Sequence, residues 1–166
     1  MGMPDHILAT QLHIAKGYYA MGVIEEPVGS NRGFWVEEFI EDGGGNPGDA
    51  WCMHGVYACH VEACRIQRLK YPLLKRTGRC KTQWLYAVDN PKLTIIQAPD
   101  ILRGHLIPDG AIWVKVRADG TGHTGFVIDH DPDTNTMKSL ECNCGNKVDI
   151  KEYIISNIAD FKGVIL

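Results

Sequence analysis

The chain has 166 residues, of which 45% are hydrophobic and 22% charged, so it can bury a core and is neither disordered nor fibrous. Its formal net charge of −3 argues against a surface adapted to nucleic-acid phosphates. No apolar stretch approaches membrane-spanning length, and polar side chains interrupt residues 1–20, so neither a membrane span nor a cleaved export signal is predicted. We expect a protein made in the cytoplasm and folded as a single domain over residues 1–166.

Helices are predicted in the first part of the chain. Apolar residues recur at helical spacing across residues 5–21, which is typical of an amphipathic helix that Gly22 would end. Turn-forming residues follow, and the spacing within residues 36–40 predicts a second, short helix. Ser30 or Asn31 is the expected N-cap of that helix.

A glycine-rich loop at residues 41–48 leads into a third helix, for which Asp49 is the expected N-cap. From there, apolar residues recur at steps of four, three, four and three, as one buried stripe made of Cys52, Val56, Cys59, Ala63 and Ile66. Cys52 then lies in the first helical turn, where free backbone N–H groups and the helix dipole favour a thiolate. The alternative is that Cys52 is a small buried hydrophobic residue.

The remaining elements are predicted from a run of basic residues and from the spacing of hydrophobic residues. Residues 65–81 contain seven basic side chains and no acidic one, and a solvated helix end and loop is favoured there over a site for an anionic polymer. A helix is expected around residues 84–88, and a short helix or a turn near residues 99–102. Runs at residues 111–116, 123–128 and 137–143, separated by turn signals, predict antiparallel strands.

Nucleophilic chemistry at Cys52 needs a base, and the sequence holds seven histidines. His54 would project to the opposite side of the same helix, and His60 would lie two turns away. His123 opens a predicted strand and has nearby glycines that leave space beside it, so it is the candidate base. The alternative is a turn histidine at a strand edge.

A third group would hold the imidazole. Glu141 and Asn143 point to the same strand face, and an odd number of loop residues around Pro132 or Asp133 would place His123 opposite one of them. A carboxylate there would fix the tautomer and stabilise the imidazolium, whereas an amide would only orient the ring. The alternative is a cross-strand polar pair at a solvated edge.

Four motifs carry a family resemblance. They are EPVGSNRG at residues 26–33, GDAWC at residues 48–52, GHTGFV at residues 122–127 and ECN at residues 141–143. In this order they resemble the motifs of CHAP-type peptidases and their NlpC-like relatives. Those proteins are papain-like cysteine hydrolases that cut amide bonds in bacterial peptidoglycan. The resemblance covers roughly residues 25–145.

The resemblance implies an α+β papain-like fold with N-terminal helices, the nucleophile at the start of the central helix, and a C-terminal antiparallel sheet. It makes Cys52 the nucleophile, His123 the general base and Glu141 the orienting acid, with Asn143 as an additional polar group. The backbone N–H of Cys52 is the natural oxyanion donor.

Substrate contacts are expected from the motif residues Asn31, Arg32 and Trp51. The sequence departs from the family pattern at residues 53–55, at residues 108–110, and at Cys142, which stands where a glycine is common. Cys142 is expected to point into the core, since its side chain alternates with those of its neighbours. These departures leave substrate preference open.

The function expected is cysteine-dependent hydrolysis of peptidoglycan, by a phage lysin or a secreted effector whose partners include a delivery or immunity protein. The alternatives are an inactive wall-polymer binding module on the same fold and a papain-like hydrolase acting on a protein. No cofactor is expected. A structural zinc is not favoured, because the close cysteine pairs lack the usual spacing. Calcium is left open by Asp42, Asn46 and Asp49 in one loop, where turn and capping roles explain them equally well.

Overall fold

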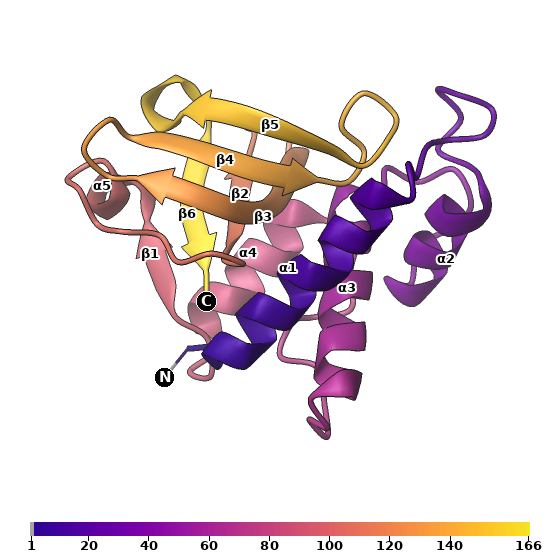
Figure 1. Cartoon of the computed structure of the whole chain (residues 1–166), viewed down its shortest axis with the longest axis horizontal. Helices are drawn as coiled ribbons and strands as arrows, with labels where there is room; N and C mark the ends of the chain where they lie inside the picture. The colour runs from indigo at the N-terminus through magenta and orange to yellow at the C-terminus, as the bar shows by residue number, and fades with distance from the viewer. Residues whose placement is uncertain (1) are drawn as a thin grey trace.

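The computed structural model describes residues 2–166 and has helices and one antiparallel sheet, so the predicted α+β class is confirmed (Figure 1). The α-helices in this range are α1 (Asp5–Ala20), α2 (Phe34–Asp42), α3 (Cys52–Ile66), α4 (Cys80–Asp89) and α5 (Ala98–Ile101). The strands are β1 (Ile95–Gln97), β2 (Ile112–Val116), β3 (Gly122–Asp131), β4 (Thr136–Glu141), β5 (Asp149–Ile154) and β6 (Phe161–Ile165), with a 3-10 turn at Ile155–Asn157. Within residues 2–166 the sheet has six strands in the order β1-β6-β2-β3-β4-β5.

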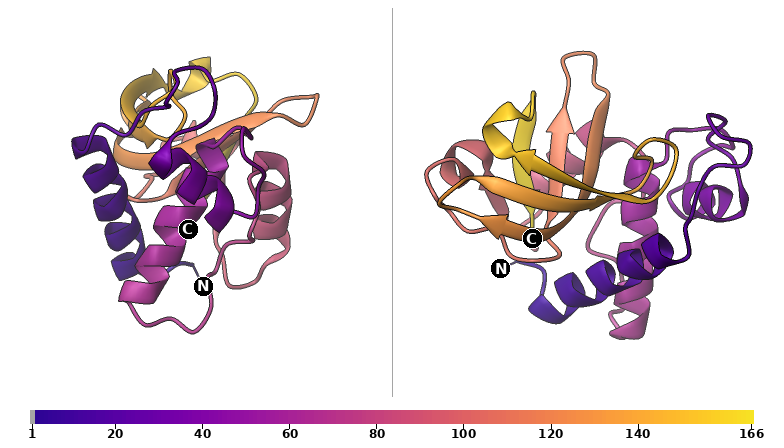
Figure 2. Two further views of the ribbon diagram at one scale, coloured as in Figure 1. Left: turned by 90° about the vertical axis from the view of Figure 1, so that its right-hand side faces the viewer. Right: turned by 45° about the horizontal axis from the view of Figure 1, so that its top comes forward.

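The helix α3 is the centre of the helical side, because it contacts α1, α2 and β3 (Figures 1 and 2). Of the predicted stripe, Ile66 is half exposed and the other members are buried. The prediction of one buried stripe nevertheless underestimated the burial of α3. Met53, Tyr57 and His60 lie on its other faces and are buried as well. Because α1, α2 and β3 pack against different sides of α3, its buried residues are not confined to one face.

Both faces of the sheet are buried at β2, whose successive side chains point alternately into two hydrophobic cores. Ile112 and Val114 belong to the core shared with α1 and α3, whereas Trp113 belongs to a second core that includes Ile101 of α5. A strand covered on both faces has a nearly continuous apolar sequence, which is the pattern of residues 111–116, where only Lys115 is polar. Cys142 lies in the first core, as expected.

Helix starts differ from their predicted caps. The first helix matches its prediction, and Gly22 follows it with a φ of 68°, a left-handed conformation that suits glycine. The N-cap of α2 is Gly33, neither Ser30 nor Asn31. The N-cap of α3 is Trp51, while the Asp49 carboxylate accepts a 2.8 Å hydrogen bond from the Asn46 backbone N–H within the preceding turn. Cys52 is still in the first turn, as predicted.

The three predicted strands are present as β2, β3 and β4, and the two later helices as α4 and α5. The strands β1, β5 and β6 were not predicted. Residues 149–154 form an edge strand with mostly exposed or half-buried side chains, so their hydrophobic alternation is weak. Among residues 2–166, no helix combines the length and the apolar character needed to cross a bilayer.

Candidate active site

Cys52 is the first residue of α3, and its thiol is almost fully buried, with 6% relative exposure for the residue. The Met53 backbone N–H donates a hydrogen bond to the Cys52 sulfur. This is one of the free N–H groups of a helix start, and it favours a negative charge on the sulfur. The expectation about the helical position of Cys52 is therefore confirmed, and the position suits a thiolate.

His123 is held by Glu141. The His123 Nε2 lies 2.8 Å from the Glu141 Oε2, and the Glu141 side chain is completely buried. The indole of Trp113 meets the imidazole edge-on, with ring centroids 5.7 Å apart, and so restricts its rotation. The predicted pairing of His123 with Glu141 is present, and it leaves Nδ1 as the ring nitrogen available to Cys52.

The register that produces this pairing differs from the predicted one. The loop between the paired residues Asp131 and Thr136 contains an even number of residues, which alone would place Cys142, not Glu141, on the face of His123. A β-bulge between Val127 and Asp129 shifts the register by one residue and reverses this outcome. The predicted odd loop was therefore wrong, and the bulge supplies the missing residue.

Cys52 and His123 form a charged pair. A hydrogen bond from Cys80, together with a hydrogen bond and the charge of His123, lowers the pKa of the Cys52 thiol well below its usual value, against the opposing effect of burial. Burial alone would lower the pKa of His123, but hydrogen bonds with Cys52 and Glu141 and their charges raise it to about 9. The raised pKa keeps His123 protonated at neutral pH, and the lowered pKa of Cys52 favours the thiolate beside it.

Two glycines of the histidine strand clear space for these neighbours. A Cβ on Gly125 would lie 2.7 Å from the Glu141 Cγ, and a Cβ on Gly122 would lie 2.7 Å from the Cys80 Cβ. Both distances are too short for real atoms, so any larger residue would displace the acid or the second thiol. The two glycines near His123 in the sequence therefore make room for specific neighbours, Gly125 for Glu141 and Gly122 for Cys80.

Cys80 was not among the predicted site residues. It is the first residue of α4, it is buried, and its side chain is hydrogen-bonded to that of Cys52. One signal in the sequence could have found it, a Thr-Gly turn shortly before a cysteine in Thr77-Gly78-Arg79-Cys80, but the helix was expected to begin later. The candidate site therefore has a cysteine at each of two helix starts.

The Glu141 carboxylate has further neighbours. Burial, and next the nearby Glu141 charge, raise the pKa of the Cys144 thiol to about 11 and that of the Tyr153 hydroxyl well above its usual value. The Glu141 Oε1 is buried and has no hydrogen-bond partner among the described residues 2–166. The acid is thus enclosed in protein, and its Oε2 is committed to His123.

Asn31 connects the segments that carry the site. Its Nδ2 donates to the Gly48 carbonyl at 3.1 Å, its Oδ1 accepts from the Asn143 Nδ2 at 3.3 Å, and its backbone N–H donates to Glu25 at 3.1 Å. Asn143, expected as an additional polar group at the imidazole, is therefore bonded to Asn31. Through these contacts Asn31 joins the loop before Cys52 to the turn after Glu141.

The other two expected substrate contacts differ in their exposure to solvent. Trp51 has no exposed surface and donates from Nε1 to the Glu25 carboxylate at 2.8 Å, so its place is in the core. Arg32 is exposed and forms a 2.9 Å ion pair with Glu37. Of these residues, Arg32 alone offers a free surface to a ligand.

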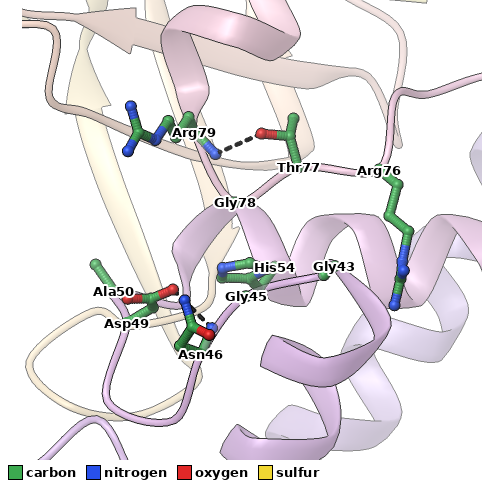
Figure 3. Close-up of a pocket in the computed structure, with 11 residues that line it drawn as sticks. Gly43, Gly45, Asn46, Asp49, Ala50, His54, Arg76, Thr77, Gly78 and Arg79 are labelled. Atoms are coloured by element: carbon green, nitrogen blue, oxygen red, sulfur yellow. Dashed lines mark hydrogen bonds between the residues drawn. The ribbon is translucent and has the colours of Figure 1, made fainter.

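A polar pocket of about 410 Å³ lies where the chain segments leading into α3 and α4 meet (Figure 3). Its lining includes Asp49, Arg76 and Arg79, with the buried His54 at its centre. The His54 ring is enclosed by glycine backbone, since a Cβ on Gly43 or Gly78 would lie within 2.0 Å of a ring nitrogen. His54 does not take part in the Cys52 pair, as expected from its position.

His60 is also accounted for by structure. Its Nδ1 lies 2.8 Å from the Gln11 Oε1, and its Nε2 accepts from the Leu73 N–H at 3.0 Å, so it ties α1 to α3 and to the following loop. Burial lowers its pKa to about 4, which keeps the ring neutral.

Residues 2–166 contain no group of three or more His, Cys, Asp or Glu side chains arranged to hold a metal ion. In the loop that left calcium open, the Asp49 carboxylate is engaged by the Asn46 N–H, which is the turn role offered as its alternative. No family model, curated protein or solved structure matches this chain, so the site rests on its own geometry.

Proposed function

We propose that this chain is a cysteine-dependent hydrolase of the papain-like, CHAP or NlpC type that cleaves an amide bond in bacterial peptidoglycan. One observation carries the hydrolase part: His123 is hydrogen-bonded to Glu141 at 2.8 Å through one ring nitrogen, and it interacts closely enough with Cys52 to lower the pKa of that thiol. Nucleophile, base and orienting acid in this order are the parts of a catalytic triad.

The reaction follows from these parts. The Cys52 thiolate attacks the amide carbonyl carbon, a C–S bond forms, and the backbone N–H of Cys52 stabilises the developing oxyanion. The His123 imidazolium then gives its Nδ1 proton to the leaving nitrogen, and the C–N bond breaks to leave a thioester. His123 next takes a proton from water, the hydroxide attacks the thioester, and the thiolate returns with release of the acid product.

The sequence motifs support peptidoglycan as the substrate. The polar pocket beside the helix starts adds to this, because Asp49 and Arg79 offer charges of both signs to a peptide that carries amino and carboxylate groups. A hydrolase acting on a protein is the second candidate, since the same triad cuts any accessible amide. A binding module is disfavoured because binding a polymer does not require a buried thiolate paired with an imidazolium.

The experiment is digestion of purified peptidoglycan, with the released products identified by mass. The wild-type chain should release fragments with new amine and carboxyl ends, and Cys52→Ala should release none while keeping its circular dichroism spectrum. Cys59→Ala is the matched control, because Cys59 lies on the same helix and has no contact with His123. Cleavage by Cys52→Ala would reject the proposal, and cleavage of casein alone would assign a protein substrate.

A further inference from the structure

We propose that Cys80 is the resolving thiol of Cys52, so that a peroxide converts the pair into a reversible disulfide that blocks the nucleophile. The inference rests on the reactive thiolate in the proposed function but not on the identity of the substrate. It concerns an oxidative modification site with a hydroperoxide as its co-substrate.

The two thiols are in contact. Cys52 and Cys80 are the first residues of α3 and α4, and their side chains are hydrogen-bonded to one another. Both are nearly buried, with relative exposures of 6% and 4%. A disulfide needs sulfurs about 2 Å apart on side chains that already face each other. Closing the bond requires the two sulfurs to approach to that distance.

The backbone around Cys80 holds this thiol in place. The ideal Cβ position of Gly122 is 3.4 Å from the Cys80 Sγ and 2.7 Å from its Cβ, so Cys80 packs against β3 immediately before His123. Cys80 is thus fixed between the nucleophile and the strand that carries the base.

The remaining cysteines are engaged elsewhere. Cys64 lies 3.3 Å from the His60 Nε2, and Cys144 lies beside Glu141. Cys59 and Cys142 are buried in the core, and burial raises the pKa of each thiol. Cys80 is the one cysteine that contributes a hydrogen bond to Cys52.

The chemistry balances with a hydroperoxide. The Cys52 thiolate attacks the terminal oxygen, the O–O bond breaks, and the leaving oxygen takes the His123 proton, giving a sulfenic acid and an alcohol or water. The Cys80 sulfur then attacks the Cys52 sulfur, the S–O bond breaks, and the departing hydroxide takes the Cys80 proton to become water. Two electrons pass from the pair to the peroxide.

The charge on Cys52 determines that Cys52 is oxidised before Cys80 attacks. While Cys52 is a thiolate, its hydrogen bond, then burial and its charge, raise the pKa of Cys80 and keep Cys80 protonated. Oxidation to a neutral sulfenic acid removes that negative charge, so the pKa of Cys80 falls when its attack is needed. The resulting disulfide also shields Cys52 from irreversible oxidation to the sulfinic acid.

The experiment treats the full chain with hydrogen peroxide, alkylates remaining thiols, and maps unreduced peptides by mass. The expected product is a cross-linked peptide joining Cys52 to Cys80, lighter by about 2 Da than the two free peptides, and dithiothreitol should restore free Cys52. In Cys80→Ser the same treatment should convert Cys52 to sulfinic acid, which dithiothreitol does not reverse. Cys64→Ser, about three turns along α3, is the control and should still form the cross-link.

Sulfinic acid on wild-type Cys52 without the cross-link, or a cross-link from Cys52 to any other cysteine, would overturn the proposal. The mapping in wild-type protein needs no variant, so a poorly folded Cys80→Ser does not remove the test. Because the readout is the cross-link and not hydrolysis, a chain that forms it but cleaves no peptidoglycan would leave this inference standing and reject the substrate instead.

Discussion

The Nε2 of His123 lies 2.8 Å from the Oε2 of Glu141, and this contact exists because the bulge between Val127 and Asp129 shifts the strand register. Without the bulge, Cys142 would share the face of His123, and Glu141 would point to the opposite one. Position on the sheet, not proximity in sequence, therefore decides which group orients the imidazole.

Replacing Gly125 tests this packing. A Cβ there would lie 2.7 Å from both the Glu141 Cγ and the Leu140 carbonyl oxygen, so Gly125→Ala should push the acid away from His123. We expect kcat/KM for peptidoglycan cleavage to fall by about a hundredfold, as for small misplacements of catalytic groups. Gly17→Ala is the control, because no atom lies within 4 Å of the added Cβ. Equal activity of the two variants would show that Glu141 has room to move without loss.

The Glu141 carboxylate is predicted to act through its charge. Glu141→Gln keeps a similar shape but removes the charge that helps raise the pKa of His123 to about 9. The alkaline limb of the pH profile should then move to lower pH, and kcat should fall by about a hundredfold or more. A purely structural role would reduce activity without moving the limb, and circular dichroism reports whether the variant is folded.

Hydrolysis by the wild-type chain should follow the protonation of His123. The imidazolium donates the proton to the leaving amine and is lost as the pH rises through its pKa of about 9, so the rate should decline above about pH 9. On the acid side, the lowered pKa of Cys52 should keep the thiolate present through neutral pH. A rate that instead rises steadily from pH 7 to beyond pH 9, following an ordinary thiol, would contradict the ion pair.

Asn31 is predicted to act by positioning the segments around the site. It has a left-handed φ of 52°, so Asn31→Gly loses the side-chain bonds to Gly48 and Asn143 without backbone strain, whereas Asn31→Ala adds that strain. We expect the free energy of unfolding to fall by about 1–3 kcal/mol in Asn31→Gly and by about 1 kcal/mol more in Asn31→Ala. Urea denaturation measures both.

The comparison variant is Arg32→Ala, which removes an exposed ion pair with Glu37 and should change the unfolding free energy by less than about 1 kcal/mol. If Arg32 contacts substrate, this variant raises KM and leaves stability unchanged. Asn31→Gly with wild-type stability and a raised KM would instead return Asn31 to the role of a substrate contact.

Periodicity predicted much of the framework. The helical spacing before Gly22 and after Asp49, and the strands that contain Trp113 and His123, follow from local patterns that burial enforces. The motifs then singled out Cys52, His123 and Glu141. Periodicity predicts which residues share a face of a strand, and it left Glu141 and Asn143 as alternatives. The family resemblance then selected Glu141 as the partner of His123.

Other features depend on distant contacts that leave no local pattern. The β-bulge is one inserted residue in a long strand, and without it the actual loop length would place Glu141 on the wrong face. Cys80 approaches Cys52 because α4 packs beside β3, an arrangement set by tertiary contacts. The edge strand β5 alternates weakly because its side chains are largely exposed. Trp51 was expected to contact substrate, yet its indole N–H is bonded to the Glu25 carboxylate inside the core.

Peptide-resolved labelling with iodoacetamide near neutral pH tests the central claim most directly, because it compares all six cysteines in one sample. Cys144 is the most exposed thiol, while Cys52 is buried, so exposure alone predicts that Cys144 is labelled first. The account predicts the reverse, with Cys52 labelled at least about tenfold faster because it is a thiolate, and with His123→Ala removing the advantage. Slow and uniform labelling, or labelling led by Cys144, would contradict it.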